Sequence, residues 1–175
     1  MIEVVRADIT TLDVDAIVNA ANESLSPGGG VCGAIYRAAG PRLVHATDGL
    51  RHCDTGNAVL TSAFDLEARF IIHAVGPVWA GGKNGEAELL TSAYENAFDV
   101  ASQNGVKSIA FPAISTGIYG YPKAEAARIA IDVMCRHEAF FDRIIACMFD
   151  DETAKLYQRL LEATRKDSEG AENLG

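Results

Sequence analysis

Short apolar runs alternate with amphipathic helical patterns along most of this chain, and this alternation limits the folds open to it. Several of the runs are apolar at consecutive positions, which is typical of strands buried on both faces of a mostly parallel sheet. Helices between parallel strands cover both faces of such a sheet, so the pattern predicts an α/β sandwich. The predicted strands are Ile2–Arg6, Ala16–Asn19, Asn57–Ser62, Phe70–Val75, Ser108–Pro112 and Arg143–Met148.

Helical patterns occupy the intervals between the apolar runs. Glu86–Gln103 carries an apolar face and ends at an Asn-Gly pair, a common helix stop. Pro122 suits a first helical turn because its missing N–H costs nothing there. Asp150 is suited to cap a last helix that ends near Arg165. The other predicted helices are Ala34–Ala39 and Pro122–His137.

Length and composition exclude several classes of protein. A chain of 175 residues fits one domain, which we place at residues 1–165, with residues 166–175 a polar tail that frays. The net charge of −9 argues against nucleic-acid partners, which require Lys and Arg over many phosphates. No apolar run approaches the length of a membrane span, and the first residues lack the pattern of a signal peptide.

The cysteines and histidines show no ligand or disulfide spacing. Four cysteines lack CxxC pairs, and four histidines lack an HExxH or similar pattern. We therefore expect free thiols, no metal site and a cytoplasmic protein.

The segment Ile17–Gly33 carries the strongest functional signal. An apolar run leads to Asn19 and Asn22, and the glycines Gly28–Gly30 then lead into a helical pattern. Glycine lets backbone approach a ligand closely, and the helix start behind it offers unpaired N–H groups and a positive dipole end. These features predict a phosphate site. The spacing matches neither a Walker A loop nor the GxGxxG fingerprint.

A second glycine-bearing loop, Ser115–Gly120, follows another predicted strand. Its backbone amides can form an anion nest, and Ile118 and Tyr119 can cover a ligand. Asp8 and Phe149 follow the first and last strands. Ligands of open α/β sheets bind beyond the carboxyl ends of the strands, so we expect these segments to meet at one edge of the sheet.

Each of these features also has a purely structural interpretation. Either glycine-bearing loop could be an ordinary turn, although two such loops after different strands favour a clamp around a ligand. Asp8 suits the amine of adenine and equally suits a turn beside Thr10. Phe149 could stack on a base or belong to the core. Asn19 could tie segments together, whereas Asn22 is the better candidate for a ribose hydroxyl or a water.

Cys32 lies at the start of the helix behind the glycines. We do not expect it to be a nucleophile, because a bound diphosphate would oppose its thiolate and no histidine lies near it in the sequence. A small, polarisable residue packed beside the ligand is the simpler interpretation. His73, inside a predicted strand, is expected to be a core histidine with its ring hydrogen-bonded.

In combination, these motifs resemble the macrodomain family from Ile2 to Arg165. The last of the matching strings is closest to the MacroD-type branch of bacterial and eukaryotic hydrolases. The resemblance implies a three-layer α/β/α sandwich with a mixed, mostly parallel sheet and a cleft for ADP-ribose. The strings are Ala7-Asp8-Ile9-Thr10, Ile17-Val18-Asn19-Ala20-Ala21-Asn22, Gly28-Gly29-Gly30-Val31, Ala39-Gly40, His73-Ala74-Val75-Gly76-Pro77 and Phe111-Pro112-Ala113-Ile114-Ser115-Thr116-Gly117-Ile118-Tyr119-Gly120-Tyr121-Pro122.

The resemblance also assigns residues to parts of the ligand. It implies that Asp8 takes the adenine amine, that Ile9 and Phe149 lie beside the base, and that the two loops hold the phosphates. Asn22 would face the distal ribose as the catalytic residue. The implied ligand-binding residues are Asp8, Ile9, Asn19, Ala21, Asn22, Gly28, Gly29, Gly30, Val31, Cys32, Gly33, Ser115, Thr116, Gly117, Ile118, Tyr119 and Phe149.

The activity that the resemblance implies is ester hydrolysis without a metal or other cofactor. MacroD-type members remove ADP-ribose from aspartate or glutamate side chains and deacetylate O-acetyl-ADP-ribose, with a water placed between a substrate phosphate and the distal ribose. The expected partners are therefore ADP-ribose or an ADP-ribosylated protein, with no membrane partner, and we expect a monomer.

Cys32 departs from the pattern of this branch. MacroD-type enzymes usually carry an aspartate at this position, commonly assigned to orient or activate the water. A thiol cannot act as a carboxylate base, and loss of such help costs on the order of 10²–10⁴ in rate. Other branches have a small residue there and still hydrolyse. The alternatives to a hydrolase are an ADP-ribose reader without turnover and another nucleotide enzyme on the same fold.

Overall fold

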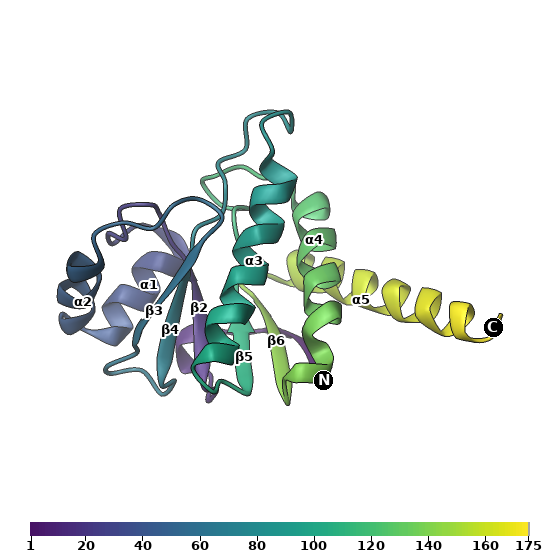
Figure 1. Cartoon of the computed structure of the whole chain (residues 1–175), viewed down its shortest axis with the longest axis horizontal. Coiled ribbons are helices and arrows are strands. Elements are labelled where there is room, and N and C mark those ends of the chain that lie inside the picture. The colour runs from purple at the N-terminus through teal and green to yellow at the C-terminus, as the bar shows by residue number, and fades with distance from the viewer. Residues whose placement is uncertain (175) are drawn as a thin grey trace.

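The structure is a computed structural model that describes residues 1–174. These residues form a six-stranded sheet with helices on both faces (Figure 1), which confirms the predicted α/β/α sandwich. The observed strands agree with the predicted ones to within one residue at either end. They are β1 (Ile2–Arg6), β2 (Ala16–Ala20), β3 (Ala58–Ser62), β4 (Phe70–Ala74), β5 (Ser108–Phe111) and β6 (Arg143–Met148).

The order of the strands across the sheet is β1-β6-β5-β2-β4-β3. Every neighbouring pair is parallel except β3 and β4, so the sheet is mixed and mostly parallel. Because β1, β2, β5 and β6 run in one direction, the segments that follow them emerge at the same edge of the sheet. This topology is what brings the predicted site residues together.

The helices include one that the sequence pattern did not predict. α2 follows α1 after only Gly40 and Pro41, in a segment where we predicted no helix. α1 itself begins at Gly30, ahead of the predicted start at Ala34. The prediction started late because glycine has a low helix propensity and gives no helical signal. The helices are α1 (Gly30–Ala39), α2 (Arg42–Leu50), α3 (Glu86–Gln103), α4 (Lys123–His137) and α5 (Asp151–Glu172), with short 3-10 turns η1 (Ile9–Thr11) and η2 (Glu138–Phe140).

α5 is longer than predicted. The Asp150 side chain caps it as expected, by accepting a hydrogen bond from the Thr153 N–H at 2.8 Å. The helix then continues past Arg165 to Glu172 and runs out beyond the body of the domain (Figure 1). The predicted polar tail is therefore helical over most of its length, because adding residues to a helix already begun is easier than starting one. Gly175 lies outside the described residues.

The core has two main layers, one on each face of the sheet. Alternation along each strand sends neighbouring side chains to opposite faces. In β6, for example, Ile144 and Ala146 pack in the layer beneath α3, α4 and α5, whereas Ile145 packs in the layer beneath α1. Within residues 1–174, no helix is both long and apolar enough to cross a membrane.

Candidate ligand-binding cleft

A cleft of about 1080 Å³ lies at the carboxyl edge of the parallel strands. Most of its lining comes from four segments: 6–9 after β1, 20–34 after β2, 112–119 after β5, and 147–153 around the end of β6. Arg37, Gly76 and Lys123 complete it. The convergence of these segments is the arrangement that the sequence pattern predicts. A cleft of this size fits a dinucleotide-sized ligand.

The first glycine-bearing loop forms one wall. Gly28, Gly29 and Gly30 line the cleft, and Gly30 takes a positive φ of 56° that other residues rarely adopt. The N–H of Gly33 donates to the carbonyl of Gly29 at 3.2 Å, so the N–H groups that precede it lie before the first hydrogen bond of α1. The start of α1 therefore presents backbone donors and a positive dipole end to the cleft.

Gly33 has a structural role instead of the predicted contact with ligand. It is buried in the first turns of α1 and is absent from the cleft lining. A Cβ atom at this position would lie 2.5 Å from the carbonyl oxygen of Gly28, closer than real Cβ contacts come. Gly33 thus allows α1 to pack directly against the glycine loop that it supports.

The second glycine-bearing loop also lines the cleft, and its Ile118 side chain lies beside Gly29 of the first loop. Ser115 is buried there with a positive φ of 68°, a conformation that costs a residue other than glycine on the order of 1–3 kcal/mol. Its carbonyl accepts from the Tyr121 N–H at 2.9 Å, and the Gly117 carbonyl accepts from the Gly120 N–H at 3.0 Å. Its hydroxyl has no hydrogen-bond partner within residues 1–174. Strain of this kind persists at sites where function requires the geometry.

Tyr94, from α3, anchors the start of this second loop. Its hydroxyl donates to the Pro112 carbonyl at 3.4 Å and accepts from the Ile114 N–H at 3.3 Å. Complete burial raises the pKa of Tyr94 to about 12, so the hydroxyl stays protonated as the donor that Pro112 requires. Tyr94 thereby links α3 to the loop that carries Ser115.

Two large apolar side chains stand almost fully exposed at the cleft. Ile118 of the second loop is 92% exposed, and Phe149, just after β6, is 93% exposed. Exposed apolar groups around a concave site are typical of surfaces that a ligand covers. Phe149 is therefore not the core residue that the alternative interpretation required.

Asp8 caps a turn, as its structural interpretation predicts, and it also lines the cleft. Its Oδ1 caps η1 by accepting from the Thr10 N–H at 3.0 Å and the Thr10 hydroxyl at 2.7 Å. The residue is also exposed and lines the cleft next to Ile9, which is buried. The cap holds the carboxylate at this end of the cleft.

Asn22 braces the segment that joins the strand to the glycine loop. Its Oδ1 accepts from the Ser24 hydroxyl at 2.9 Å and the Ser26 N–H at 3.0 Å, and its Nδ2 donates to the Ser26 carbonyl at 3.0 Å. Asn22 is half-buried and lines the cleft. An amide has two N–H donors, so one remains for a ligand or a water.

Asn19 does not reach the cleft, which corrects its predicted contact with ligand. It shares a strand face with Ile17, so its side chain points into the core below α1. Asn19 is fully buried and pairs in register with His73 of β4. Its Nδ2 lies 3.1 Å from His73 Nδ1 and 3.7 Å from Cys32 Sγ. It therefore ties segments together, as the alternative interpretation proposed.

His73 is the predicted core histidine with a hydrogen-bonded ring. Its Nε2 lies 3.0 Å from the Thr61 hydroxyl, and its Nδ1 faces Asn19. Burial lowers the pKa of His73 to about 4, so the ring is neutral at pH 7. A buried series of polar contacts therefore runs from Thr61 through His73 and Asn19 to Cys32.

Cys32 contributes a largely buried thiol to the cleft wall. It is 6% exposed, and its Sγ lies 3.9 Å from the Ser26 carbonyl. The side chain that the Cys32 sulfur contacts is that of Asn19, not that of a histidine. The arrangement contains no base positioned to activate Cys32 as a nucleophile, within the part of the chain that the structure describes.

The family of the chain follows from a comparison with known proteins. Residues 18–130 match the family model described as Macro domain. The chain belongs to the macrodomain family. This match spans the glycine loop, the second loop and the strands between them.

Relatives and solved structures agree with this assignment. A protein of Enterobacter sp. (strain 638) named O-acetyl-ADP-ribose deacetylase is 55% identical over 167 residues, which cover 91% of this macrodomain and 93% of that protein. The Oceanobacillus iheyensis macrodomain with ADP has a TM-score of 0.90 and 39% identity, covering 95% of this chain and 92% of that one. The Trypanosoma brucei macrodomain in complex with ADP-ribose has a TM-score of 0.83 and 38% identity, covering 90% and 68%.

The structure of this macrodomain adds three basic side chains that the sequence patterns did not single out. Arg6, Arg37 and Lys123 all line the cleft. Arg6 forms an ion pair with Asp151 at 3.1 Å. Arg6 ends β1 and Lys123 begins α4 shortly after the second loop, and these positions could have identified both residues from the sequence. Positive charge near the cleft complements an anionic ligand in this otherwise acidic protein.

Proposed function

We propose that this macrodomain binds ADP-ribose and hydrolyses ADP-ribosyl esters. The substrates would be proteins that carry ADP-ribose on aspartate or glutamate, and O-acetyl-ADP-ribose. The observation that carries the proposal is that both glycine-bearing loops line the same cleft. Backbone donors at the start of α1 and in the loop around Ser115 suit a diphosphate held from both sides. Relatives at 52–55% identity that are named O-acetyl-ADP-ribose deacetylase support it.

The residues around the loops suit the two ends of ADP-ribose. Asp8 would accept from the adenine amine, with Phe149 stacked on the ring and Ile9 beneath it. Asn22 lines the same cleft, ahead of the glycine loop in the chain, and would face the distal ribose. Its remaining N–H would hold a ribose hydroxyl or the attacking water.

Hydrolysis in this cleft would rest on positioning and electrostatic stabilisation. Water adds to the ester and releases a carboxylic acid together with ADP-ribose. The substrate phosphate would assist deprotonation of the water, and the loop amides would stabilise the developing charge. Asn22 is assigned the catalytic role, and Cys32 is assigned none as a base.

A specific feature favours a second function, an ADP-ribose reader without turnover. Cys32 places a thiol where the resemblance to MacroD-type enzymes leads us to expect a carboxylate. Its sulfur contacts Asn19 and the Ser26 carbonyl, and neither group can supply a base. Binding would then be retained while the chemical step is lost.

A side-by-side binding and hydrolysis assay separates these functions. We expect the purified protein to release ADP-ribose from a glutamate-modified protein and from O-acetyl-ADP-ribose. Asn22→Ala should slow release more than it weakens ADP-ribose binding measured by calorimetry. Asn104→Ala, an exposed asparagine whose Nδ2 donates to Val100 at the end of α3, is the control and should change neither. Tight binding with intact substrate at high enzyme concentration would establish the reader instead.

A further inference from the structure

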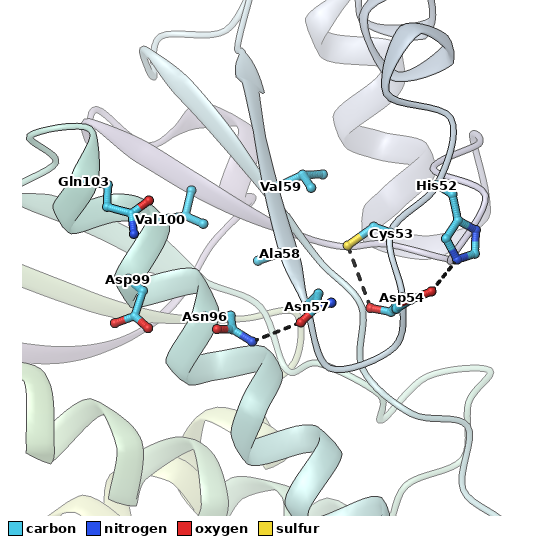
Figure 2. A pocket seen from close by; sticks show the side chains of 10 residues that line it. All are labelled: His52, Cys53, Asp54, Asn57, Ala58, Val59, Asn96, Asp99, Val100 and Gln103. Atoms are coloured by element: carbon cyan, nitrogen blue, oxygen red, sulfur yellow. Dashed lines mark hydrogen bonds and ion pairs between the residues drawn. The ribbon is translucent and has the colours of Figure 1, made fainter.

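A cluster of metal-ligating side chains lies outside the cleft, where the segment after Asn22 meets the segment after α2. Glu23, His52 and Asp54 each offer one ligand atom, and these atoms lie within 4.8 Å of one another. His52 Nε2 is 2.7 Å from Asp54 Oδ1 and 3.9 Å from Glu23 Oε2. Figure 2 shows the His52 ring and the Asp54 carboxylate directed toward each other. One ion could therefore contact all three residues.

Backbone contacts hold the two segments of this cluster together. The Cys53 N–H donates to the Glu23 carbonyl at 2.9 Å, and the Thr55 N–H donates to Glu23 Oε2 at 3.2 Å. Cys53 itself is buried beneath the cluster. The three ligating residues are thus attached to backbone that is already in place, which reduces the entropy lost when an ion binds.

The cluster carries more negative charge than its protein partners neutralise. Within residues 1–174, the ion pairs of Glu23 and Asp54 are with His52, and no lysine or arginine joins them. Even with a protonated His52, two carboxylates share one positive charge, so a cation would be attracted to this place.

We propose that Glu23, His52 and Asp54 form a site for a divalent transition-metal ion such as Zn²⁺. Imidazole nitrogen and carboxylate oxygen are common ligands of this class of ion. His52 would bind the ion through Nε2, the nitrogen that lies 2.7 Å from Asp54 Oδ1. Three protein ligands leave a coordination position for water.

The proposed site borders two other features of the molecule. His52 and Asp54 also line a hollow of about 400 Å³, whose far wall is the α3 face with Asn96 and Asp99 (Figure 2). Glu23 directly follows Asn22, which lines the cleft. An ion bound here would clamp the Asn22 segment to the segment after α2, close to the ADP-ribose cleft but separate from it.

Calorimetric titration with ZnCl₂ of the reduced, intact protein tests the site. We expect one equivalent to bind, and His52→Gln or Asp54→Asn to weaken binding by about tenfold or more, since even outer-shell partners of a metal ligand are worth about 10–100-fold. All three ligands are exposed, so these variants should fold normally by circular dichroism. His45→Gln, an exposed histidine of α2, is the matched control and should bind as the wild type does.

Two results would overturn the proposal. One is the absence of saturable Zn²⁺ binding by the wild-type protein. The other is equal binding by wild type, His52→Gln and Asp54→Asn, which would mean that thiols elsewhere hold the ion. Cys53→Ser distinguishes the nearest thiol, because the proposed ligand set predicts that this variant keeps its affinity. The ion should also raise the melting temperature of wild type but not of His52→Gln, as expected when a ligand binds only the folded state.

Discussion

Cys32 places a thiol in the wall of the proposed active site, between the Asn22 segment and the glycine loop. Its neighbours, Asn19 and the Ser26 carbonyl, are uncharged. If the missing carboxylate limits the rate, Cys32→Asp should raise ester hydrolysis by a factor on the order of 10². Release of ADP-ribose from a modified protein measures this. Cys32→Ser is the control, because it keeps a small polar group without a carboxylate. An unchanged rate for Cys32→Asp would show that the carboxylate is not what limits turnover.

Phe149 makes little contact with the rest of the protein, so replacing it should affect ligand binding but not stability. It is 93% exposed. Phe149→Ala should weaken ADP-ribose binding by about 1–3 kcal/mol, the scale of base–aromatic stacking, and leave the melting temperature unchanged. Phe140→Ala, a 68% exposed phenylalanine of η2, should affect neither quantity. Calorimetry and thermal unfolding check both variants. Unaltered affinity for Phe149→Ala would contradict the stacking role.

At the scale of elements, the phosphate site depends on how closely α1 approaches the glycine loop. An added Cβ at Gly33 would lie 2.5 Å from the Gly28 carbonyl oxygen, so Gly33→Ala must push the loop away. We expect it to destabilise the protein by about 1–3 kcal/mol and to weaken ADP-ribose binding. Gly49→Ala in α2 is the matched control, because nothing lies within 4 Å of its Cβ position. That change should be neutral or stabilise by up to about 1 kcal/mol. Urea unfolding compares the two, and equal effects would contradict the packing role.

At the scale of the whole molecule, His73 makes stability depend on pH. Its pKa is lowered to about 4 by burial, against an ordinary value of 6.5. Between these values the unfolded chain binds a proton that the folded protein excludes, so stability falls as pH drops from 6.5 to 4. The shift corresponds to a loss of about 3 kcal/mol. The contribution of Asp15, whose pKa is lowered by the Lys107 N–H, is lost at still lower pH.

Urea unfolding at several pH values tests this contribution. His73→Gln should be less stable than wild type at pH 7, because its fit to Asn19 and Thr61 is poorer. Its unfolding free energy should nevertheless change less between pH 6.5 and 4 than that of wild type. Parallel curves for the two proteins would mean that another group controls acid stability in this range.

The sequence by itself determined the fold class, the strands and most of the cleft. Periodicity is a local property, so Glu86–Gln103 and each strand could be located to within one residue. The carboxyl ends of parallel strands share one edge, and this rule alone placed Asp8, Ser115 and Phe149 around one cleft. The resemblance to macrodomains then identified ADP-ribose as the expected ligand.

Only the tertiary structure decided which polar residues face the cleft and which face the core. Asn19 and Asn22 look alike in sequence, yet the strand face and its register with His73 bury Asn19. Gly33 supports the loop because α1 packs against it, which spacing along the chain does not reveal. Likewise, Glu23 meets the nearby pair His52 and Asp54 only through a contact between distant segments, which no ligand spacing along the chain indicated. Burial and proximity arise from packing between segments that are distant in the sequence, so local sequence patterns do not reveal them.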